Sequence, residues 1–415
     1  MLKGTCRYDV RVLFTTRIVR LFCYGFLSVV LALYLAQAGL REQQIGLLFT
    51  LTLAGDAGVT LWLTSTADRF GRKRTLIAGA LLMFGAGVVF ILTREVALLM
   101  AAAIVGVISP SGNEIGPFLS VEQAALSQLL PGERRTQVFA WYNLAGSFAT
   151  AVGALSGGWL AQLLQARGET ALEAYRTILA GYAFGGLLLA VLFLSLTREI
   201  EVGAIPGTAG EAPRSFGLHR SRPIVVKLAA LFSLDAFAGG LVVQSMIAYW
   251  FHVKFGIAAG LIGSIFFGAN VLAGISALTA ARLARRFGLI NTMVFTHVPS
   301  NILLILVPLM PTLPLAAAML LLRFSISQMD VPTRQSYTMA VVAPDERSAA
   351  SGVTSIARSV GAAISPTLTG IFLASRALFS LPFFLSGGLK LVYDALLYRS
   401  FRALRPPEEE PSNRR

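Results

Sequence analysis

Charged residues are scarce in this chain of 415 residues. Asp, Glu, Lys and Arg together make up 13% of the sequence, whereas soluble globular proteins contain about 25%. Hydrophobic residues account for 55%. A soluble chain of this composition would expose a large apolar surface that promotes aggregation. The shortage of charge therefore excludes an ordinary soluble domain and indicates a protein that lies in a lipid bilayer.

Cysteine and histidine are also rare, with two Cys and three His. Cys6 and Cys23 supply no disulfide framework, and no spacing of Cys and His residues is typical of a metal site. The sequence has no Walker loop, no other nucleotide-binding signature and no Ser-His-Asp arrangement outside the apolar segments. We therefore expect neither an enzyme nor a protein that binds a metal or a cofactor.

Long apolar runs fill the chain instead. A helix needs about 20 apolar residues to cross the hydrocarbon core of a bilayer, and twelve runs approach or exceed that length. They occupy about 13–38, 45–66, 75–93, 97–128, 136–165, 175–197, 224–251, 258–281, 289–309, 313–342, 348–373 and 377–399. The sequence therefore predicts an all-α membrane protein with twelve transmembrane helices.

The net charge of +14 comes from cations that lie mainly between these runs. If the N-terminus is cytoplasmic, about 25 of the 35 Lys and Arg fall on the cytoplasmic side and about six on the other. This bias predicts a multi-pass protein of the cell (inner) membrane with both termini in the cytoplasm. No basic segment outside the spans interleaves aromatic residues, so we expect no nucleic acid partner.

The two halves of the chain resemble each other. Pro131-Gly-Glu-Arg134 follows the fourth run, and Pro344-Asp-Glu-Arg347 follows the tenth. A Gly- and Ala-rich run comes after each. The loop Asp68-Arg-Phe-Gly-Arg72 has a weaker counterpart in Ala284-Arg-Arg-Phe-Gly288. Such a repeat predicts two pseudo-symmetric six-helix bundles, with a substrate site near the midplane of the membrane where they meet.

A polar stretch separates the halves. It contains Pro, Gly and charged residues and no long apolar run, which is typical of a linker. The end of the chain is polar and predicts disorder. We expect an N-terminal six-helix bundle at 1–197, a cytoplasmic linker at 198–223, a C-terminal six-helix bundle at 224–402 and a disordered cytoplasmic tail at 403–415.

The loop between the second and third runs contains the sequence Ala67-Asp-Arg-Phe-Gly-Arg-Lys-Arg74. It resembles the loop motif of the major facilitator superfamily, Gly-x-x-x-Asp-Arg/Lys-x-Gly-Arg/Lys-Arg/Lys, with Thr64 in place of the first Gly. The number of spans, the central linker and the charge topology resemble that family as well. The resemblance implies that the loop is a cytoplasmic gate and that its acidic residue contacts the start of span eleven, near Ser348. The gate residues are Asp68, Arg69, Gly71, Arg72 and Lys73.

Ionisable side chains also lie within the predicted spans. Placing such a group at the centre of a membrane helix costs about 2.5–3.5 kcal/mol on insertion scales and usually marks a transport pathway. At about 1.5 Å per residue, most of these groups lie about 13–18 Å from the cytoplasmic ends of their helices. We predict a substrate and proton pathway formed by Asp56, Asn113, Glu114, Glu122, Gln123, Asp235, Asp330, Arg334 and Arg358.

Span four is unusual because residues 109–123 contain two Pro and two Gly together with four amides or acids, Asn113, Glu114, Glu122 and Gln123. Pro and Gly should break the helix and free backbone polar groups, which a membrane tolerates only beside a cavity or other protein. A kinked helix alone explains Pro and Gly but not the two glutamates. The stretch therefore favours a role in substrate or proton handling.

Other charged residues leave alternatives open. Asp330 and Arg334 are four residues apart and can pair directly, so a static ion pair and a substrate or gating role are equally consistent with the sequence. Lys390 and Asp394 have the same spacing in span twelve, which is peripheral in the family, and we interpret them as a structural pair. We interpret the solitary His297 as an interhelical histidine rather than a proton relay.

These features predict a secondary active transporter that moves a small organic solute by alternating access of its two bundles. We expect coupling to protons because carboxylates within the spans can bind and release them, and export is slightly favoured. One alternative is proton-coupled uptake of an anionic metabolite bound by Arg334 and Arg358. Another is a non-transporting membrane sensor of the same fold. The expected partners are membrane lipid, a small-molecule substrate and protons, and a monomer is favoured.

Overall fold

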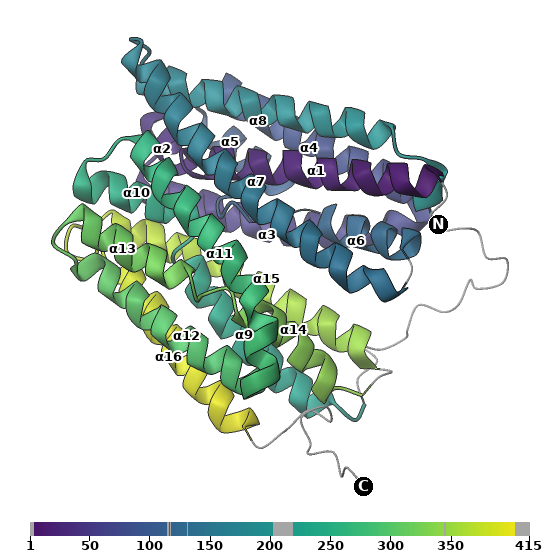
Figure 1. Cartoon of the computed structure of the whole chain (residues 1–415). Helices are drawn as coiled ribbons and strands as arrows, with labels where there is room; N and C mark the ends of the chain where they lie inside the picture. Colours follow the sequence, from purple (N-terminus) through teal and green to yellow (C-terminus); the bar gives the residue numbers. More distant parts are fainter. Residues whose placement is uncertain are drawn as a thin grey trace, which may run out of the picture. The chain divides into compact units, whose positions relative to one another are not determined.

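The structure is a computed structural model that describes residues 4–113, 116, 118–130, 132–201, 219–343 and 346–402. Only the backbone is described at 4–5, 64–69, 132–136, 281 and 348. These residues form sixteen α-helices and two short 3-10 helices, with no β-strand in the described part (Figure 1). The prediction of an all-α protein is confirmed.

The first half of the chain contains eight of the α-helices. They are α1 (Gly4–Ser28), α2 (Leu31–Gln37), α3 (Glu42–Phe70), α4 (Arg72–Leu92), α5 (Val96–Val105), α6 (Phe118–Leu129), α7 (Gly132–Ala166) and α8 (Ala171–Leu194), followed by the 3-10 helix η1 (Arg198–Ile200).

The second half contains the other eight. They are α9 (Arg222–Gly240), α10 (Gln244–Phe255), α11 (Ala259–Phe287), α12 (Leu289–Leu306), α13 (Leu313–Phe324), α14 (Asp330–Val341), α15 (Arg347–Leu373) and α16 (Leu381–Phe401), with η2 (Val307–Leu309) after α12.

Four of the spans consist of two helices each. The helices α1 and α2 meet at a bend of 44°, and the pairs α5 and α6, α9 and α10, and α13 and α14 are separated by non-helical residues. Length and apolarity alone identify eight spans in the described residues, or nine with the bent pair. Adding α5 with α6, α13 with α14, and α16 makes twelve. The two-helix spans are the first, fourth, seventh and tenth, so the breaks recur at equivalent positions in the two halves.

A glycine begins the third span of each half. Gly71 precedes α4 with φ +99°, and Gly288 precedes α12 with φ +85°. Each follows a phenylalanine. Positive φ is open to glycine at little cost and is unfavourable for other residues, so both sites require this residue. The same backbone conformation at these two glycines is consistent with the sequence similarity between the two loops and supports an internal repeat.

Contacts divide the chain into two compact units. Unit 1 contains residues 1–204, 243–271 and 366–379, and unit 2 contains 205–242, 272–365 and 380–415. Unit 1 therefore holds the first half together with α10, the start of α11 and the end of α15. This division by contact differs from a division by sequence halves, and the bundle boundaries at 197 and 224 stay a prediction.

Glycines allow close helix packing in unit 1. Gly153 and Gly157 of α7 lie against the carbonyl oxygens of Phe22 and Phe26 of α1, and an added Cβ would come within 2.1 Å of either oxygen. Small residues permit this approach of two membrane helices. The helix α8 packs against both α4 and α1, as Figure 1 shows. The Gly- and Ala-rich character of the fifth span thus has a packing cause.

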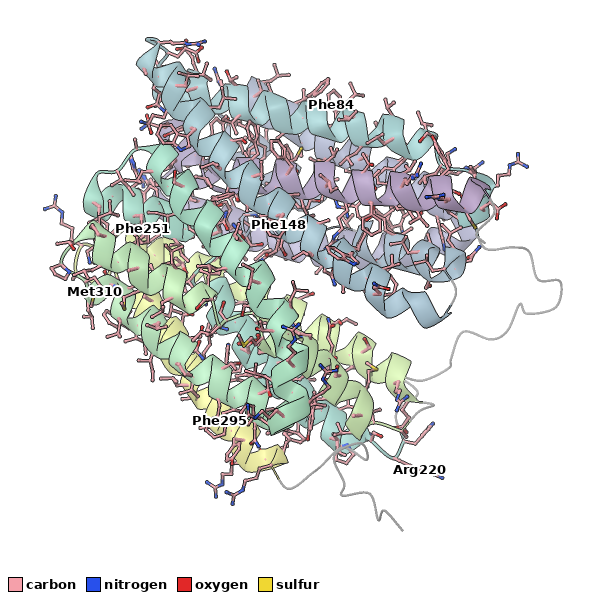
Figure 2. The ribbon with its side chains drawn as sticks, in the orientation of Figure 1. Phe84, Phe148, Arg220, Phe251, Phe295 and Met310 are labelled. Carbon is pink, nitrogen blue, oxygen red and sulfur yellow. The ribbon has the colours of Figure 1, made fainter. Side chains whose placement is uncertain are left out.

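Unit 2 has a buried apolar core that includes Phe232 of α9, Met293 of α12, Tyr337 of α14, and Tyr393 and Leu397 of α16. The outer faces of its helices carry apolar side chains as well. Phe295 of α12, for example, points away from its helix and is 63% exposed (Figure 2). Apolar side chains on both faces are expected of a helix that packs on protein on one side and on lipid on the other.

Candidate functional site

Asp235 on α9 is the centre of a charged cluster buried in unit 2. Its Oδ1 lies 2.5 Å from Nζ of Lys390 on α16. Its Oδ2 lies 3.0 Å from Nη1 of Arg334 on α14 and 3.3 Å from Nη1 of Arg358 on α15. Arg334 also lies 3.2 Å from Oδ2 of Asp330, one turn away on α14. One carboxylate is therefore shared by cations from three other helices.

Histidine joins this cluster to a second carboxylate. Nε2 of His297 on α12 lies 3.8 Å from Oδ1 of Asp235, and its Nδ1 lies 2.8 Å from Oδ1 of Asp394. Nδ2 of Asn301 donates to Oδ2 of Asp394 at 3.0 Å. The sequence suggested a pair between Lys390 and Asp394, but the closest partner of Lys390 is Asp235. His297 is an interhelical histidine, although it is not solitary.

The members of the cluster differ in their access to solvent. The side chains of Lys390, Arg334 and Asp235 are 9%, 7% and 6% exposed. The side chain of Arg358 is 35% exposed. Arg358 is therefore the most accessible member of this ion-pair network.

Unit 1 contains a second buried ion pair. Nη1 of Arg20 on α1 donates to Oε1 of Glu122 on α6 at 2.9 Å, and Nη2 donates to Oε2 at 2.7 Å. The hydroxyl of Thr16 donates to Oε1 at 2.9 Å, and the hydroxyl of Tyr142 on α7 donates to Oε2. Both charged side chains are 0% exposed. The carboxylate thus has a bidentate charged partner and two neutral donors, which is the strong form of such a pair.

Asp56 on α3 holds the break in span four. Its Oδ1 accepts a hydrogen bond from the backbone N–H of Gly116 at 2.6 Å, and Gly116 has φ +81°. Because a break inside a membrane helix frees backbone donors, a carboxylate beside it can satisfy one of them. Asn113 lies in the same break and is exposed, and Gln123 on α6 is half-buried. The predicted break is confirmed.

The described part of the loop motif joins α4 to the end of α8. The backbone N–H groups of Arg72 and Lys73 donate to the carboxylate of Glu201 at 2.7 and 3.1 Å. A carboxylate is favourable at a helix N-terminus, where unpaired N–H groups point outward. Nζ of Lys73 donates to the carbonyl oxygens of Leu194 and Leu196 at the C-terminal end of α8, both at 2.7 Å. Gly71 supplies the turn between α3 and α4.

A similar cap occurs at the start of α9 in unit 2. The carboxylate of Glu346 accepts hydrogen bonds from the backbone N–H groups of His219, Arg220 and Ser221 at 2.5, 2.8 and 2.8 Å. Burial by itself raises the pKa of Glu346, but these hydrogen bonds outweigh it and lower the pKa to about 2. Glu346 therefore ties the segment before α15 to the start of α9.

The structure brings some of the predicted pathway residues together and not others. Asp235, Asp330, Arg334 and Arg358 form one cluster in unit 2. Glu122 belongs to a separate ion pair in unit 1, and Asp56 and Asn113 lie at the break in span four. Glu114, the side chains of Asp68, Arg69 and Ser348, linker residues 202–218 and tail residues 403–415 lie outside the described residues.

Sequence reasoning missed some partners of these groups. Arg20 lies within the first apolar run, and that position is a signal of a buried role. Tyr142 gave no signal, because a lone tyrosine in a span is common. Lys390 and His297 were noted, but a single sequence does not show which distant carboxylate each contacts.

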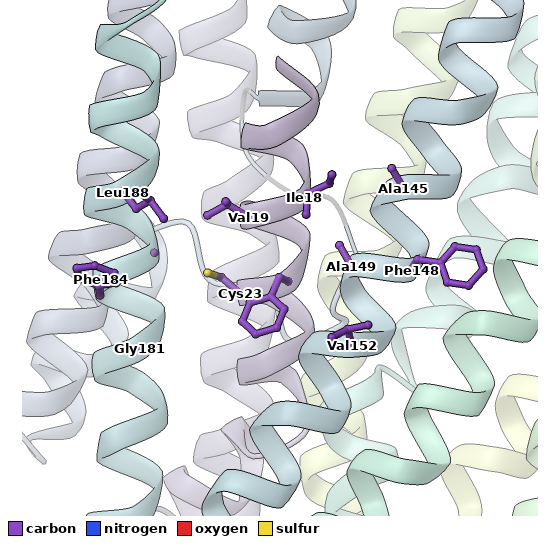
Figure 3. Close-up of a pocket in the computed structure, with 12 residues that line it drawn as sticks. Ile18, Val19, Cys23, Ala145, Phe148, Ala149, Val152, Gly181, Phe184 and Leu188 are labelled. Carbon is purple, nitrogen blue, oxygen red and sulfur yellow. The ribbon is translucent and has the colours of Figure 1, made fainter. Parts of the chain in front are cut away.

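Two further observations bear on the choice of site. An apolar groove of about 630 Å³ lies between α1, α7 and α8, with Val19, Cys23 and Ala149 in its wall and Phe184 at its edge (Figure 3). Its lining includes no charged side chain, so it has no group to recognise a polar solute. In the described residues, no group of three or more His, Cys, Asp or Glu side chains is placed to hold a metal ion.

Twelve spans in two repeats, with ionisable clusters buried inside the helical units, define a multi-pass membrane protein with the architecture of a solute transporter. The profile of the Major Facilitator Superfamily matches residues 13–366 and 228–415. The chain belongs to the Major Facilitator Superfamily, as the loop motif implied.

Relatives and solved structures agree with this assignment. An uncharacterized membrane protein of Saccharomyces cerevisiae is 29% identical over 98% of this chain and 97% of its own length. A bacterial homolog of the human lysosomal transporter Spinster has a TM-score of 0.72 at 16% identity, with coverage of 96% and 97%. The D-xylose-proton symporter has a TM-score of 0.70 at 15% identity, with coverage of 94% and 97%. Both solved structures establish a shared transporter fold.

Proposed function

We propose that this protein is a proton-coupled secondary active transporter that moves a small organic solute across the cell membrane by alternating access. One observation carries the proposal: Asp235 is shared by Lys390, Arg334 and Arg358 inside a membrane-spanning unit. The family supports transport, and one solved structure of the same fold is that of a D-xylose-proton symporter. The proposed coupling site is the cluster around Asp235.

The geometry links proton binding to the arrangement of four helices. Buried charges are costly, and removing one partner leaves the others uncompensated. A proton on Asp235 removes the negative charge that Lys390, Arg334 and Arg358 share. These cations must then find another anion or move toward water. Since they project from α16, α14 and α15, a change of protonation on α9 acts on all of these helices at once.

The same proposal covers the groups of unit 1 and the loop motif. The Glu122 pair and the break beside Asp56 are further candidate steps on the pathway, together with Asn113, Glu114 and Gln123. The motif residues Asp68, Arg69, Gly71, Arg72 and Lys73 form the proposed cytoplasmic gate. Export is the first candidate direction, with the protein in the inner cell membrane and both termini in the cytoplasm.

The test is solute flux in liposomes that contain the purified protein, with a pH gradient imposed in either direction. We expect the gradient to drive flux of a transported solute and Asp235→Asn to abolish that dependence. Glu169→Gln removes one carboxylate from an exposed loop and is the matched control, which should behave as wild type. Flux through the wild-type protein that is independent of the pH gradient would reject proton coupling.

A second candidate is proton-coupled uptake of an anionic solute. The exposure of Arg358 favours it, because this cation can reach an anion while it contacts the proposed proton site. The same liposome assay separates the two candidates. Exchange moves solute against the direction of proton flow, whereas symport moves solute with it.

A further inference from the structure

The cluster in unit 2 contains more positive than negative groups. Arg323 on α13 lies within electrostatic reach of Asp235 and Asp330, and its buried Nε has no hydrogen-bond partner in the described structure. The Lys and Arg side chains in and around this cluster therefore number four and the carboxylates three, so the cations exceed the carboxylates by one. The cations are Arg323, Arg334, Arg358 and Lys390, and the carboxylates are those of Asp235, Asp330 and Asp394.

The ion pair of unit 1 is balanced in charge. Arg20 and Glu122 are paired one to one, both are sealed from solvent, and the carboxylate has two additional neutral donors. Such a pair has no charge left to neutralise. Unit 1 has one further buried cation, Arg17, whose guanidinium donates to the carbonyl oxygen of Tyr142 and to Oδ1 of Asn143. The cluster around Asp235 differs in that one of its cations, Arg358, is partly exposed. Because an uncompensated charge is unfavourable among membrane helices, an anion bound at this cluster would be stabilised.

Arg358 is the cation best placed to receive that anion. It is the most exposed of the three that contact Asp235, and its distance of 3.3 Å to Oδ2 is the longest of the three ion-pair distances. Lys390 and Arg334 continue to hold Asp235 if Arg358 turns away. A guanidinium group presents a planar fork of donors that matches a carboxylate in a bidentate arrangement.

Hydroxyl groups lie on the same face of α15. Ser355 is exposed and stands three residues before Arg358, and residues three or four apart on a helix are neighbours. Ser351 and Ser359 are exposed as well and continue the stripe at intervals of four residues. Hydroxyl donors beside a guanidinium suit the oxygens of a carboxylate and also the polar part of a small organic anion.

We infer that Arg358, assisted by Ser355, binds the carboxylate of the transported solute, so that the substrate is a small organic anion. The inference rests on the proposed function, whose coupling site it shares. When the anion takes Arg358, Asp235 loses one of its three cations while Lys390, Arg334 and His297 still face it. Loss of a cation favours a proton on Asp235. Anion and proton therefore bind together and move in the same direction, as in the second candidate above.

The experiment measures binding to the purified full-length protein in detergent by its thermal stabilisation, since a ligand of the folded state raises the unfolding temperature. The probes are linear, hydroxylated and aromatic mono- and dicarboxylates, each paired with its primary amide. Hits are titrated against Arg358→Gln, Arg358→Lys and Ser355→Ala. Arg285→Gln removes an equal charge from an exposed position at the end of α11 and is the matched control.

We expect at least one carboxylate, and not its amide, to stabilise the wild-type protein and R285Q equally. R358Q should weaken its binding roughly 10- to 100-fold, the range for loss of hydrogen bonds to a charged group. R358K retains the charge but loses the planar fork of donors, so its affinity should lie between those of the wild-type protein and R358Q. The unfolding temperature without ligand verifies that each variant folds. Amides that bind as well as carboxylates, or an R358Q protein with wild-type affinity, would overturn the inference.

The same variants keep this inference distinct from the proposed function. Gradient-driven flux of a neutral solute, unchanged in R358Q, would reject an anionic substrate and leave proton coupling in place. Carboxylate binding that depends on Arg358, without any effect of a pH gradient on flux, would reject proton coupling and leave the anion site in place.

Discussion

The sealed pair of Arg20 and Glu122 allows a quantitative test of what a buried ion pair contributes here. Arg20→Met removes the bidentate partner of the carboxylate and retains the hydroxyl donors of Thr16 and Tyr142. Breaking a buried pair from one side costs about 3–5 kcal/mol, because the remaining charge is uncompensated. We expect R20M to lower the free energy of unfolding by this amount, and Glu122→Gln to do so similarly.

The double variant R20M/E122Q removes both charges and should recover most of the loss. A buried ion pair replaced by uncharged groups of similar volume is often close to neutral in stability, and Gln retains an oxygen for the two hydroxyls. The measurement is the free energy of unfolding of the purified protein in mixed micelles. Arg11→Met, at an exposed position of the same helix, is the control and should stay within about 0.5 kcal/mol of wild type.

Two outcomes would refute this reasoning. Single variants as stable as R11M would show that the pair is not desolvated in the way that its burial indicates. A double variant as unstable as the singles would show that geometry, and not uncompensated charge, is the source of the loss. Transport by the double variant shows whether the pair serves stability or transport. Gradient-driven flux that persists in the double variant assigns the pair to stability. Loss of that flux assigns Glu122 to the pathway.

Three further predictions concern the helix contacts. Gly46→Ala should destabilise the protein by about 1–3 kcal/mol, since its Cβ would lie 2.4 Å from the carbonyl oxygen of Pro366, whereas Gly58→Ala on the same helix meets open space and should be neutral or stabilising. The pKa of Glu346 is lowered to about 2 in the folded protein. Its ionised carboxylate therefore contributes fully to the free energy of unfolding above the pKa of the unfolded chain, about 4.3, and this contribution is lost as pH falls toward 2. The loss should be absent in Glu346→Gln. Thr170→Ala should cost about 1 kcal/mol by removing the capping box that starts α8.

Thermal and chemical unfolding as a function of pH are sufficient to check these three. Equal effects of the two glycine substitutions would contradict the close contact at Gly46. An acid profile of E346Q that superimposes on that of the wild-type protein would contradict the capping role of Glu346. A T170A protein with unchanged stability would show that the start of α8 depends on packing rather than on its cap.

Apolar length predicted the spans, but it did not predict every helix. Pro and Gly in residues 109–123 predicted the break between α5 and α6, and the structure contains it. The break between α13 and α14 has no such signal, because residues 325–329 contain neither Pro nor Gly. The nearby Pro332 lies in the first turn of α14, where its missing N–H has no partner to lose.

Charged pairs show the same division between local and distant information. Asp330 and Arg334 are one turn apart, so their contact was open to prediction from spacing alone. Lys390 and Asp394 have the same spacing, yet Lys390 lies against Asp235, which is 155 positions away. Spacing shows only which pairs are able to form. Which of them forms depends on the helices that pack alongside.

The sequence by itself determined that the chain lies in a membrane, how often it crosses, where the halves repeat and which family it joins. These properties follow from hydrophobicity, charge bias and short local motifs, all of which are read along the chain. Tertiary structure alone decided that Asp235 is shared by cations from three helices, that Arg20 pairs with Glu122 out of contact with solvent and that Arg358 stays partly exposed. The physical reason is that a buried charge takes the partner nearest in space, and that neighbour is set by helix packing.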